Sequence, residues 1–320
     1  MDSTSRLAEI YQTQLAPALL ALEAERKTVV KRILLSTAIL LLGVLFFIVG
    51  RGATYAIVAG VVIVIGAIIS YAFASERYNL YKQAFKNNIV PKVVASIDPS
   101  WCYSPQSHIS QAEYYQSRLF EKRCDRFKGD DLITGMIGKT DFRLSELHTE
   151  YRTVTVDNKG RRSEQWHTIF KGLFVHADFN KEIKDQTFVL PDTAERLLGK
   201  WGQKLQSFDP RGQLVKLENP EFETYFVVYA SNQTEARYIL TPIVMEALVT
   251  MRKQFNTEIA ISFVGTRVYF AFSFSQDLFE PRLFSSGVRF TDIEQMQYQF
   301  NMITVIINEL NLNTRIWTKT

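Results

Sequence analysis

Two stretches near the N-terminus decide how this 320-residue chain is built. They read ILLSTAILLLGVLFFIVG at residues 33–50 and GATYAIVAGVVIVIGAIISYAFAS at residues 52–75, and only Arg51 separates them. Neither contains Asp, Glu, Lys, Arg or His. As helices they reach roughly 27 and 36 Å, and a bilayer hydrocarbon core is about 30 Å thick. The sequence therefore predicts a helical hairpin that crosses a membrane twice.

Two other interpretations of these stretches are weaker. A helix in a soluble core seldom runs this far without a charged residue. A cleaved signal peptide would suit the small-x-small pattern at 72–74. However, the apolar region of a signal peptide is about 7–15 residues long, and two longer runs precede that pattern.

Basic residues flank the two predicted spans at the ends that lie away from the connecting loop. Before the first span stand Arg26, Lys27, Lys31 and Arg32, and after the second stand Arg77, Lys82, Lys86 and Lys92. The connecting loop holds only Arg51. Because Lys and Arg favour the cytoplasmic side, we expect both termini in the cytoplasm and the loop outside, as for a multi-pass protein of a cell inner membrane.

Composition excludes several other classes of protein. Apolar residues make up 47% and charged residues 22% of the chain, and Gly and Pro number 15 and 9, which excludes collagen-like and low-complexity chains. The net charge of +4 is too weak to indicate a nucleic-acid partner. Cys102 and Cys124 are the only cysteines. They suit a reducing compartment without a disulfide framework.

Four regions are predicted along the chain. Residues 1–32 form an amphipathic N-terminal helix interrupted by Pro17, 33–75 the two transmembrane helices, 76–98 a juxtamembrane helix, and 99–320 a cytoplasmic α+β domain. The N-terminal helix could lie on the membrane, pack on the soluble part or pair with another copy. The juxtamembrane helix continues the second span, since its apolar residues recur at helical spacing.

Two β-hairpins with helices between and after them predict the α+β class. Alternating residues predict strands at 142–154 and 166–178 around the turn signal at 157–160, and a second hairpin at 259–264 and 267–274. Shorter strands are expected at 187–190, 214–217 and 224–230. Helix starts are expected at Asp192, Asn232 and Pro242, the last helix running to about Phe255.

The C-terminal helix carries an apolar seam between residues 291 and 312. Its members are Ile293, Met296, Phe300, Ile303, Ile307 and Leu310. The alternating spacing of three and four resembles a short coiled coil, but it extends over fewer heptads than such a structure needs. The seam is therefore either core packing or a surface for a second copy or partner.

No pattern specifies a catalytic, cofactor-binding or metal-binding residue. The histidines are His108, His148, His167 and His176, and the last two are expected on opposite faces of one strand. Gly138-Lys139-Thr140 resembles the end of a phosphate-binding loop, but Ile133 occupies the position of its first glycine, so a strand-edge turn is expected. Asp130 and Asp131 show no spacing that specifies a role.

Ten phenylalanines on or near predicted strands are expected to pack in the core, with a docking face as the alternative. They are Phe170, Phe174, Phe179, Phe188, Phe222, Phe226, Phe263, Phe270, Phe272 and Phe274.

Three stretches resemble a bacterial family catalogued as domain of unknown function three-one-three-seven. They read FKGLFVHADFN at 170–180, NPEFETYFVVY at 219–229 and TEARYILTP at 234–242. The resemblance extends over about 77–320 and the hairpin, and implies a two-pass anchor before a cytoplasmic α+β region. It also implies a neighbouring LemA-type membrane protein as a partner. It assigns no catalytic residue.

These observations favour a membrane-anchored interaction or scaffold protein in a larger assembly, as a homo-oligomer or with another membrane protein. We expect no enzymatic activity, cofactor or nucleic-acid partner. The alternatives are a membrane-associated enzyme and a lipid-handling protein. An enzyme would need a pocket where at least two of His148, His167, Glu146, Glu150 and Asp178 meet.

Overall fold

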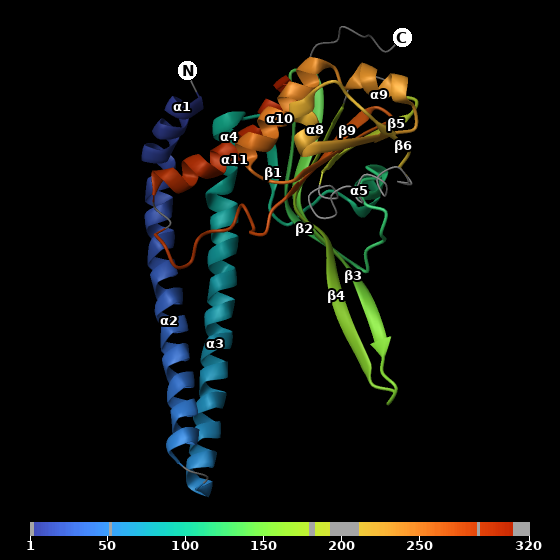
Figure 1. Ribbon diagram of the computed structural model, residues 1–320. Coiled ribbons are helices and arrows are strands. Elements are labelled where there is room, and N and C mark those ends of the chain that lie inside the picture. The colour runs from blue at the N-terminus through green and yellow to red at the C-terminus, as the bar shows by residue number, and fades with distance from the viewer. Residues whose placement is uncertain (1–2, 51–52, 179–182, 193–210, 287–288, 310–320) are drawn as a thin grey trace. The chain divides into compact units, whose positions relative to one another are not determined.

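The computed structural model describes residues 3–50, 53–178, 183–192, 211–286 and 289–309 (Figure 1). The chain divides into two compact units. The first, Met1–Pro99 with Phe279–Tyr298, is built mainly of helices and is called the helical unit. The second, Ser100–Leu278 with Gln299–Thr320, contains the β-sheet and is called the sheet unit.

Two long helices dominate the helical unit, and each contains one predicted span. They are α2 (Ala16–Val49) and α3 (Thr54–Asn88), preceded by α1 (Ser3–Ile10) and the π-helical turn η1 (Tyr11–Leu15) and followed by α4 (Val90–Ile97). Pro17 lies in the first turn of α2, directly after the π-helical turn η1, so the helical hydrogen-bond pattern changes just before this residue. The second span continues within α3 as far as Asn88, and the helix expected over 76–98 is then divided at Ile89, before α4.

Small residues let α2 and α3 pack closely along their length. A Cβ added at Gly43 would lie 3.0 Å from Val64 Cγ2, and Ala56 and Ala67 are buried on the same seam. The hydroxyls of Ser36 and Ser70 form a 2.7 Å hydrogen bond between the helices. This is the packing that small residues permit between apolar helices.

The sheet unit contains a nine-stranded antiparallel sheet within the described residues, which confirms the α+β class. The order is β1-β2-β3-β4-β9-β8-β5-β7-β6. The bounds are β1 Cys102–Ser104, β2 Arg126–Ile137, β3 Thr140–Val156, β4 Arg162–Asp178, β5 Gln186–Pro191, β6 Gln213–Val215, β7 Phe226–Ala230, β8 Ile259–Val264 and β9 Arg267–Ser273. Both predicted hairpins are present, as β3–β4 and β8–β9.

Among the described residues, five helices lie in and after the sheet, and the first four begin at side-chain caps. They are α5 Gln111–Gln116, α8 Pro220–Tyr225, α9 Gln233–Ile239, α10 Pro242–Phe255 and α11 Phe290–Glu309. The helix expected from Pro242 to Phe255 is confirmed, with Thr241 capping its first turn. The helix expected from Asp192 lies outside the described residues.

The strand expected from Thr224 is wrong at its start. Thr224 and Tyr225 end α8, and β7 begins one residue later. The Asn219 side chain accepts a hydrogen bond from Phe222 N, and Pro220 fills the first helical position. This cap makes one helical turn before the chain extends, and it overrides the β preference of Thr224 and Tyr225.

Most of the phenylalanines singled out in the sequence belong to the core. Eight of them are at most 3% exposed: Phe170, Phe174, Phe188, Phe222, Phe226, Phe263, Phe270 and Phe272. Phe274 is half-buried, and Phe179 lies outside the described residues. Core packing is therefore confirmed for these eight, and they provide no docking face.

The described part of the C-terminal seam is buried within one chain. Ile293, Met296, Phe300 and Ile307 are at most 6% exposed, while the side chains of Ile303 and Leu310 are outside the described set. In the helical unit, Gln297 Nε2 of α11 donates to Ser96 Oγ of α4 at 3.1 Å. The four buried side chains favour core packing over a seam for a second copy.

Candidate functional site

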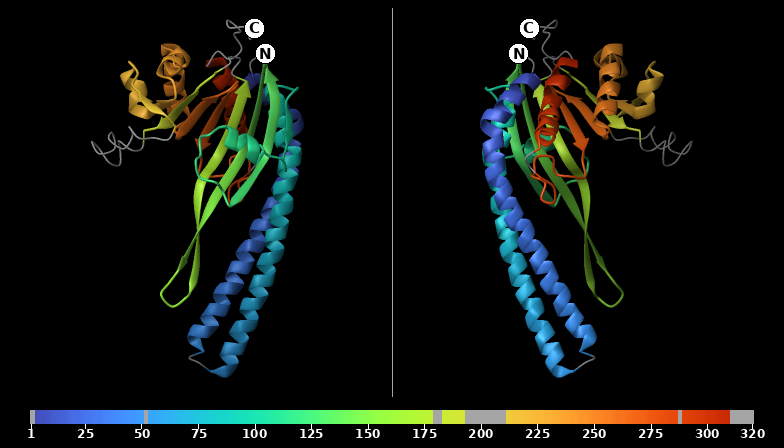
Figure 2. Two further views of the ribbon diagram at one scale, coloured as in Figure 1. Left: turned by 90° about the vertical axis from the view of Figure 1, so that its right-hand side faces the viewer. Right: turned by 90° about the vertical axis from the view of Figure 1, so that its left-hand side faces the viewer.

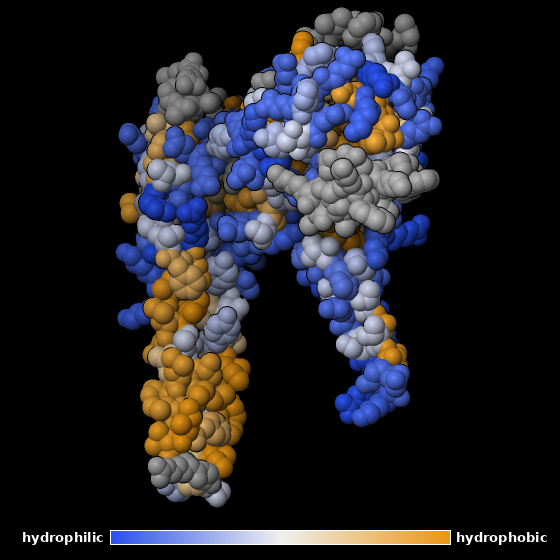
Figure 3. Space-filling model, viewed as in Figure 1, coloured by the Kyte–Doolittle hydropathy of each residue, from blue (hydrophilic) through white to orange (hydrophobic). Residues whose placement is uncertain are grey.

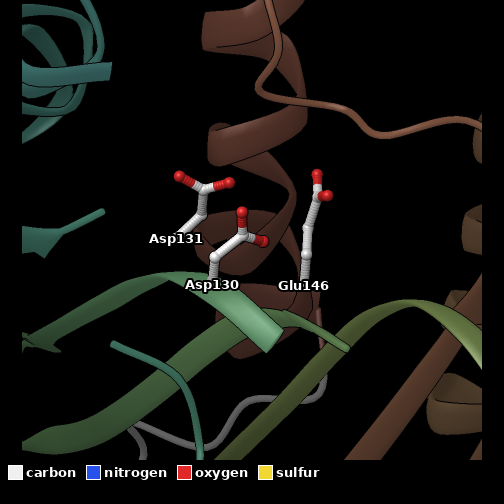
Figure 4. A group of neighbouring side chains, drawn as sticks. All are labelled: Asp130, Asp131 and Glu146. Atoms are coloured by element: carbon white, nitrogen blue, oxygen red, sulfur yellow. The ribbon is translucent and has the colours of Figure 1, made fainter. Parts of the chain in front are cut away.

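Three carboxylates gather where β2 lies beside β3 (Figure 4). Asp130 stands opposite Glu146 in the ladder, and Asp131 follows directly. One carboxylate oxygen from each of the three lies within 4.8 Å of the others. Figure 4 shows all three side chains rising from the same side of the strands. Asp131 is fully buried and Glu146 is 9% exposed. We call these three residues the acid cluster.

A β-bulge in β2 brings the two aspartates to one side. Neighbouring residues of a regular strand point to opposite faces. Here the register shifts between Asp130 and Ile133, and Asp131 has a φ of +58°. Asp131 N donates to Pro105 O at 3.2 Å, outside the ladder. The Asp131 carboxylate accepts a hydrogen bond from the Tyr103 hydroxyl, whose pKa is raised by burial and by the Asp131 charge.

Glu146 holds a proton far more tightly than an ordinary carboxyl. Burial, followed by the charge of Asp131, raises its pKa to about 8. The Leu278 backbone N–H donates to Glu146 Oε1 at 2.6 Å, which opposes the rise only in part. At neutral pH the acid cluster therefore contains a protonated carboxyl beside two aspartates.

Two kinds of positive charge suit such a cluster. One is the proton that Glu146 holds. The other is a hard cation such as Ca²⁺ or Mg²⁺, which prefers carboxylate and carbonyl oxygens. Across the described ranges no other three His, Cys, Asp or Glu side chains come this close together. From the sequence we expected no metal-binding residue, and the gathering of these three carboxylates was not predicted.

A second charged cluster surrounds His176 on the opposite face of β3 and β4. His176 is 3% exposed, and its Nδ1 accepts from Arg267 Nε at 2.9 Å. Its Nε2 lies 3.5 Å from Glu113 Oε1 without a hydrogen bond, and that oxygen accepts a hydrogen bond from Arg143 Nη1 at 2.9 Å. Burial, together with the Arg267 charge, lowers the pKa of His176 to about 4. His176 is therefore a neutral, structural histidine at physiological pH.

The prediction that His167 and His176 face opposite sides of the strand is wrong. His167 pairs with Tyr151 and His176 with Arg143, and these two β3 residues share a face. The register shift between Thr149 and Glu150 leaves Ile169 as an extra residue in β4. That bulge reverses the alternation, so both histidines point to one side of the ladder.

The candidate enzyme residues do not meet at one point. His148 Nε2 lies 3.7 Å from Glu150 Oε1, longer than a hydrogen bond. His167 Nε2 is instead 2.8 Å from Thr153 Oγ1 and its ring stacks on Tyr151. Glu146 belongs to the acid cluster. His148 and Glu150 are therefore neighbours without a hydrogen bond between them, while His167 has a different partner. Asp178 ends β4, where it pairs with Arg267 of β9 in the ladder.

A small pocket lies elsewhere in the sheet unit. It measures about 180 Å³ and is lined by β6, the following loop, α8, β7 and Asp192. None of the candidate enzyme residues or acid-cluster residues lines it. Pockets that enclose drug-sized ligands usually measure about 300–1,000 Å³.

The remaining residues singled out in the sequence have structural roles. Gly138, with a φ of +61°, forms the β2–β3 turn with Lys139, so the expected strand-edge turn is confirmed. Cys102 is an exposed free thiol and Cys124 a half-buried one. The His108 ring packs 5.5 Å from the ring of Phe127.

The acid cluster could not be assembled from the sequence. The β2–β3 turn pairs Ile137 with Thr140, and a regular register from there would place Leu147 opposite Asp130. The bulge shifts the register by one residue, so that Glu146 lies opposite Asp130 in place of Leu147. The sequence signal is Gly129-Asp130-Asp131, a glycine and two poor β-formers inside a strand, which is typical of a bulge.

Comparison with known proteins identifies one family. A family model described as a protein of unknown function, DUF3137, matches residues 168–312. The suspected family is thereby confirmed. The match begins in β4, covers β5 to β9 and includes α11. The DUF3137 description assigns no activity.

Other comparisons add little. No curated protein matches the chain. Among solved structures, one similar chain is described as the mycobacterial trehalose monomycolate transport factor A, TtfA. The two share 11% identity, and the alignment covers 68% of this chain and 96% of that one, with a TM-score of 0.32. That score is too low to establish a common fold.

Proposed function

We propose that this DUF3137 protein is a two-pass protein of a bacterial inner membrane that presents its sheet unit in the cytoplasm as an interaction module of a larger assembly. The observation that carries the proposal is the apolar outer surface of the α2–α3 hairpin. The finer points, namely the membrane, the orientation and the partner, are inferences from charge, exposure and family resemblance.

The outer surface of α2 and α3 is apolar and exposed. Figure 3 shows hydrophobic residues gathered over the part of the hairpin that leads to its loop. Leu41 is 64%, Ile48 70% and Tyr55 79% exposed. The most apolar windows of the two helical stretches have mean hydropathies of 2.5 and 2.6, and only 11% and 17% of them is buried. Soluble proteins seldom expose contiguous apolar surface of this extent, so a lipid environment is the simplest explanation.

The charges at one end of the hairpin support the orientation. Arg77 Nη1 lies 4.0 Å from Glu25 Oε2, so the start of α2 and the later part of α3 are neighbours. Lys27, Lys31 and Arg32 of α2 are exposed near this end, as is Arg77 of α3. A basic band at one end of a hairpin favours the cytoplasmic side for that end.

An interaction role fits the sheet unit better than catalysis. His148 and Glu150 are not hydrogen-bonded to each other, His167 contacts Thr153 instead, and the described pocket is small. A LemA-type membrane protein is the partner that the family resemblance suggests.

The test is chemical crosslinking in native membranes followed by purification of the full chain in detergent. We expect a reproducible crosslinked partner or a second copy. The proposal would be contradicted by a monomer without partners that turns over a small molecule and loses turnover on His167→Ala. A co-purified lipid would favour the lipid-handling alternative.

A further inference from the structure

The β3–β4 hairpin extends beyond the strands on either side of it (Figures 1 and 2). The last pair between β2 and β3 is Arg126–Glu150, and the last pair between β4 and β9 is Gly172–Ser273. Residues 151–156 and 162–168 pair only with each other in the described structure. We call residues 151–168 the arm. An isolated two-stranded ribbon is marginally stable in water, so its retention needs a reason.

The ladder register gives the arm two different faces. Arg152 pairs with Trp166, Val154 with Glu164 and Val156 with Arg162, and these six side chains share one face. On it Val154 is 40%, Val156 66% and Trp166 37% exposed. The opposite face carries Tyr151, Thr153, Thr155, Ser163, Gln165 and His167. One face therefore exposes apolar groups and the other is polar.

Cations surround the apolar face. The guanidinium carbon of Arg126 lies 3.8 Å from the Trp166 ring centroid, and that of Arg152 lies 5.8 Å away. The Glu164 carboxylate is shared by Arg152 at 3.2 Å and Arg162 at 3.5 Å. Arg126 is itself paired with Glu150 at 2.9 Å, so the positive charge of this face comes from the two guanidiniums that share the one carboxylate of Glu164.

The tip of the arm adds a net positive charge, because Lys159 and Arg161 outnumber the one carboxylate of Asp157. The Asp157 carboxylate accepts hydrogen bonds from Lys159 N and Arg161 N, both at 2.8 Å, so it closes the turn. The side chains of Lys159 and Arg161 are exposed and make no ion pair with any residue that the structure describes. Figure 3 shows a hydrophobic patch on the arm next to its hydrophilic tip.

We propose that the arm is a second, peripheral membrane contact that binds the anionic headgroups of a phospholipid bilayer. Trp at headgroup level, small apolar side chains at the acyl boundary and Lys or Arg at the phosphates form the usual composition of an interfacial contact. An anionic leaflet complements the positive face and tip. The inference rests on the proposed function, because the α2–α3 anchor keeps the sheet unit near a bilayer.

The test uses the full chain in lipid nanodiscs, with Cys102→Ser and Cys124→Ser as background. Asn158→Cys carries an environment-sensitive fluorophore at the arm tip, and Thr234→Cys on α9 carries it at a control site. We expect a blue shift at residue 158 in discs containing phosphatidylglycerol, but not in phosphatidylcholine discs or at residue 234. The shift should disappear in about 1 M salt, where the screening length is about 3 Å.

Two sets of variants test whether the fluorescence shift depends on the arm or on the overall charge of the protein. Lys159→Gln/Arg161→Gln/Arg162→Gln and, separately, Val154→Ser/Val156→Ser should each lose most of the shift. Lys128→Gln/Lys184→Gln/Lys216→Gln removes the same charge from exposed sites elsewhere in the sheet unit and should keep it.

Three outcomes would overturn the inference. They are an absent shift, a shift equal in both triple variants, and a shift that needs a co-purified protein and ignores lipid charge. The last would make the arm a protein-docking element. Incorporation of the chain into discs reports on the anchor alone, so failure of the anchor and failure of the arm give different results.

Discussion

At the residue scale, Glu146 links the stability of the sheet unit to pH. Its pKa rises from 4.5 to about 8 on folding. Between these values the folded protein keeps a proton that the unfolded chain releases. Its contribution to stability is therefore fully present below about pH 4.5 and is lost as pH rises through about 8.

We predict that Glu146→Gln removes this pH dependence. The unfolding free energy of the variant minus that of the wild type should increase with pH across this window, by at most about 1.4 kcal/mol per unit. Thermal unfolding at a series of pH values measures it. Glu218→Gln, at an exposed position, is the control and should follow the wild type. Parallel curves for Glu146→Gln and wild type would show that Glu146 titrates normally.

Gly172 allows β4 and β9 to approach each other. It has a φ of +146°, and an added Cβ would lie 2.0 Å from the Phe272 carbonyl oxygen. Gly265, in the β8–β9 turn, has a φ of +62° and open space around it. A side chain at Gly172 would therefore cause both a steric clash and backbone strain, whereas one at Gly265 would cause backbone strain alone.

We predict that Gly172→Ala destabilises the protein by about 2–5 kcal/mol, because strain and overpacking combine. Gly265→Ala should cost about 1–2 kcal/mol, from the left-handed conformation alone. Chemical denaturation of both variants provides the comparison. Equal losses would mean that β4 and β9 lie farther apart than the ladder places them.

At the scale of elements, helices and strands whose residues follow one regular pattern could be predicted from the sequence. The uncharged runs gave α2 and α3, and the Asp157–Gly160 turn with alternating flanks gave β3 and β4. β1, β2 and α5 were not predicted. β2 contains a bulge that breaks its alternation, and α5 has six residues, too few for a periodic signal.

The α2–α3 interface supplies the element-scale prediction. A Cβ at Gly43 would touch Val64 and Ile63 at 3.0 and 3.1 Å, whereas one at Gly66 would touch nothing within 4 Å. Gly43→Leu should force the two helices apart and lower the melting temperature in detergent. Gly66→Leu should leave it nearly unchanged, because that position lies outside the helix contact. A similar loss in both variants would contradict this packing.

At the scale of the whole molecule, the class of architecture could be predicted from the sequence, but the acid cluster could not. The cluster depends on one bulge and on Tyr103 and Leu278, which come from distant parts of the chain. Such contacts leave no local pattern. The family match extends over residues 168–312 and leaves the function to be argued from the apolar hairpin.

The most direct test of the central claim is cysteine labelling of intact cells. In the Cys102→Ser/Cys124→Ser background, Arg51→Cys and Asn158→Cys are exposed separately to a membrane-impermeant maleimide, before and after lysis. The account predicts that Arg51→Cys is labelled in intact cells and Asn158→Cys only after lysis. Labelling of Asn158→Cys in intact cells, with Arg51→Cys protected until lysis, would contradict it.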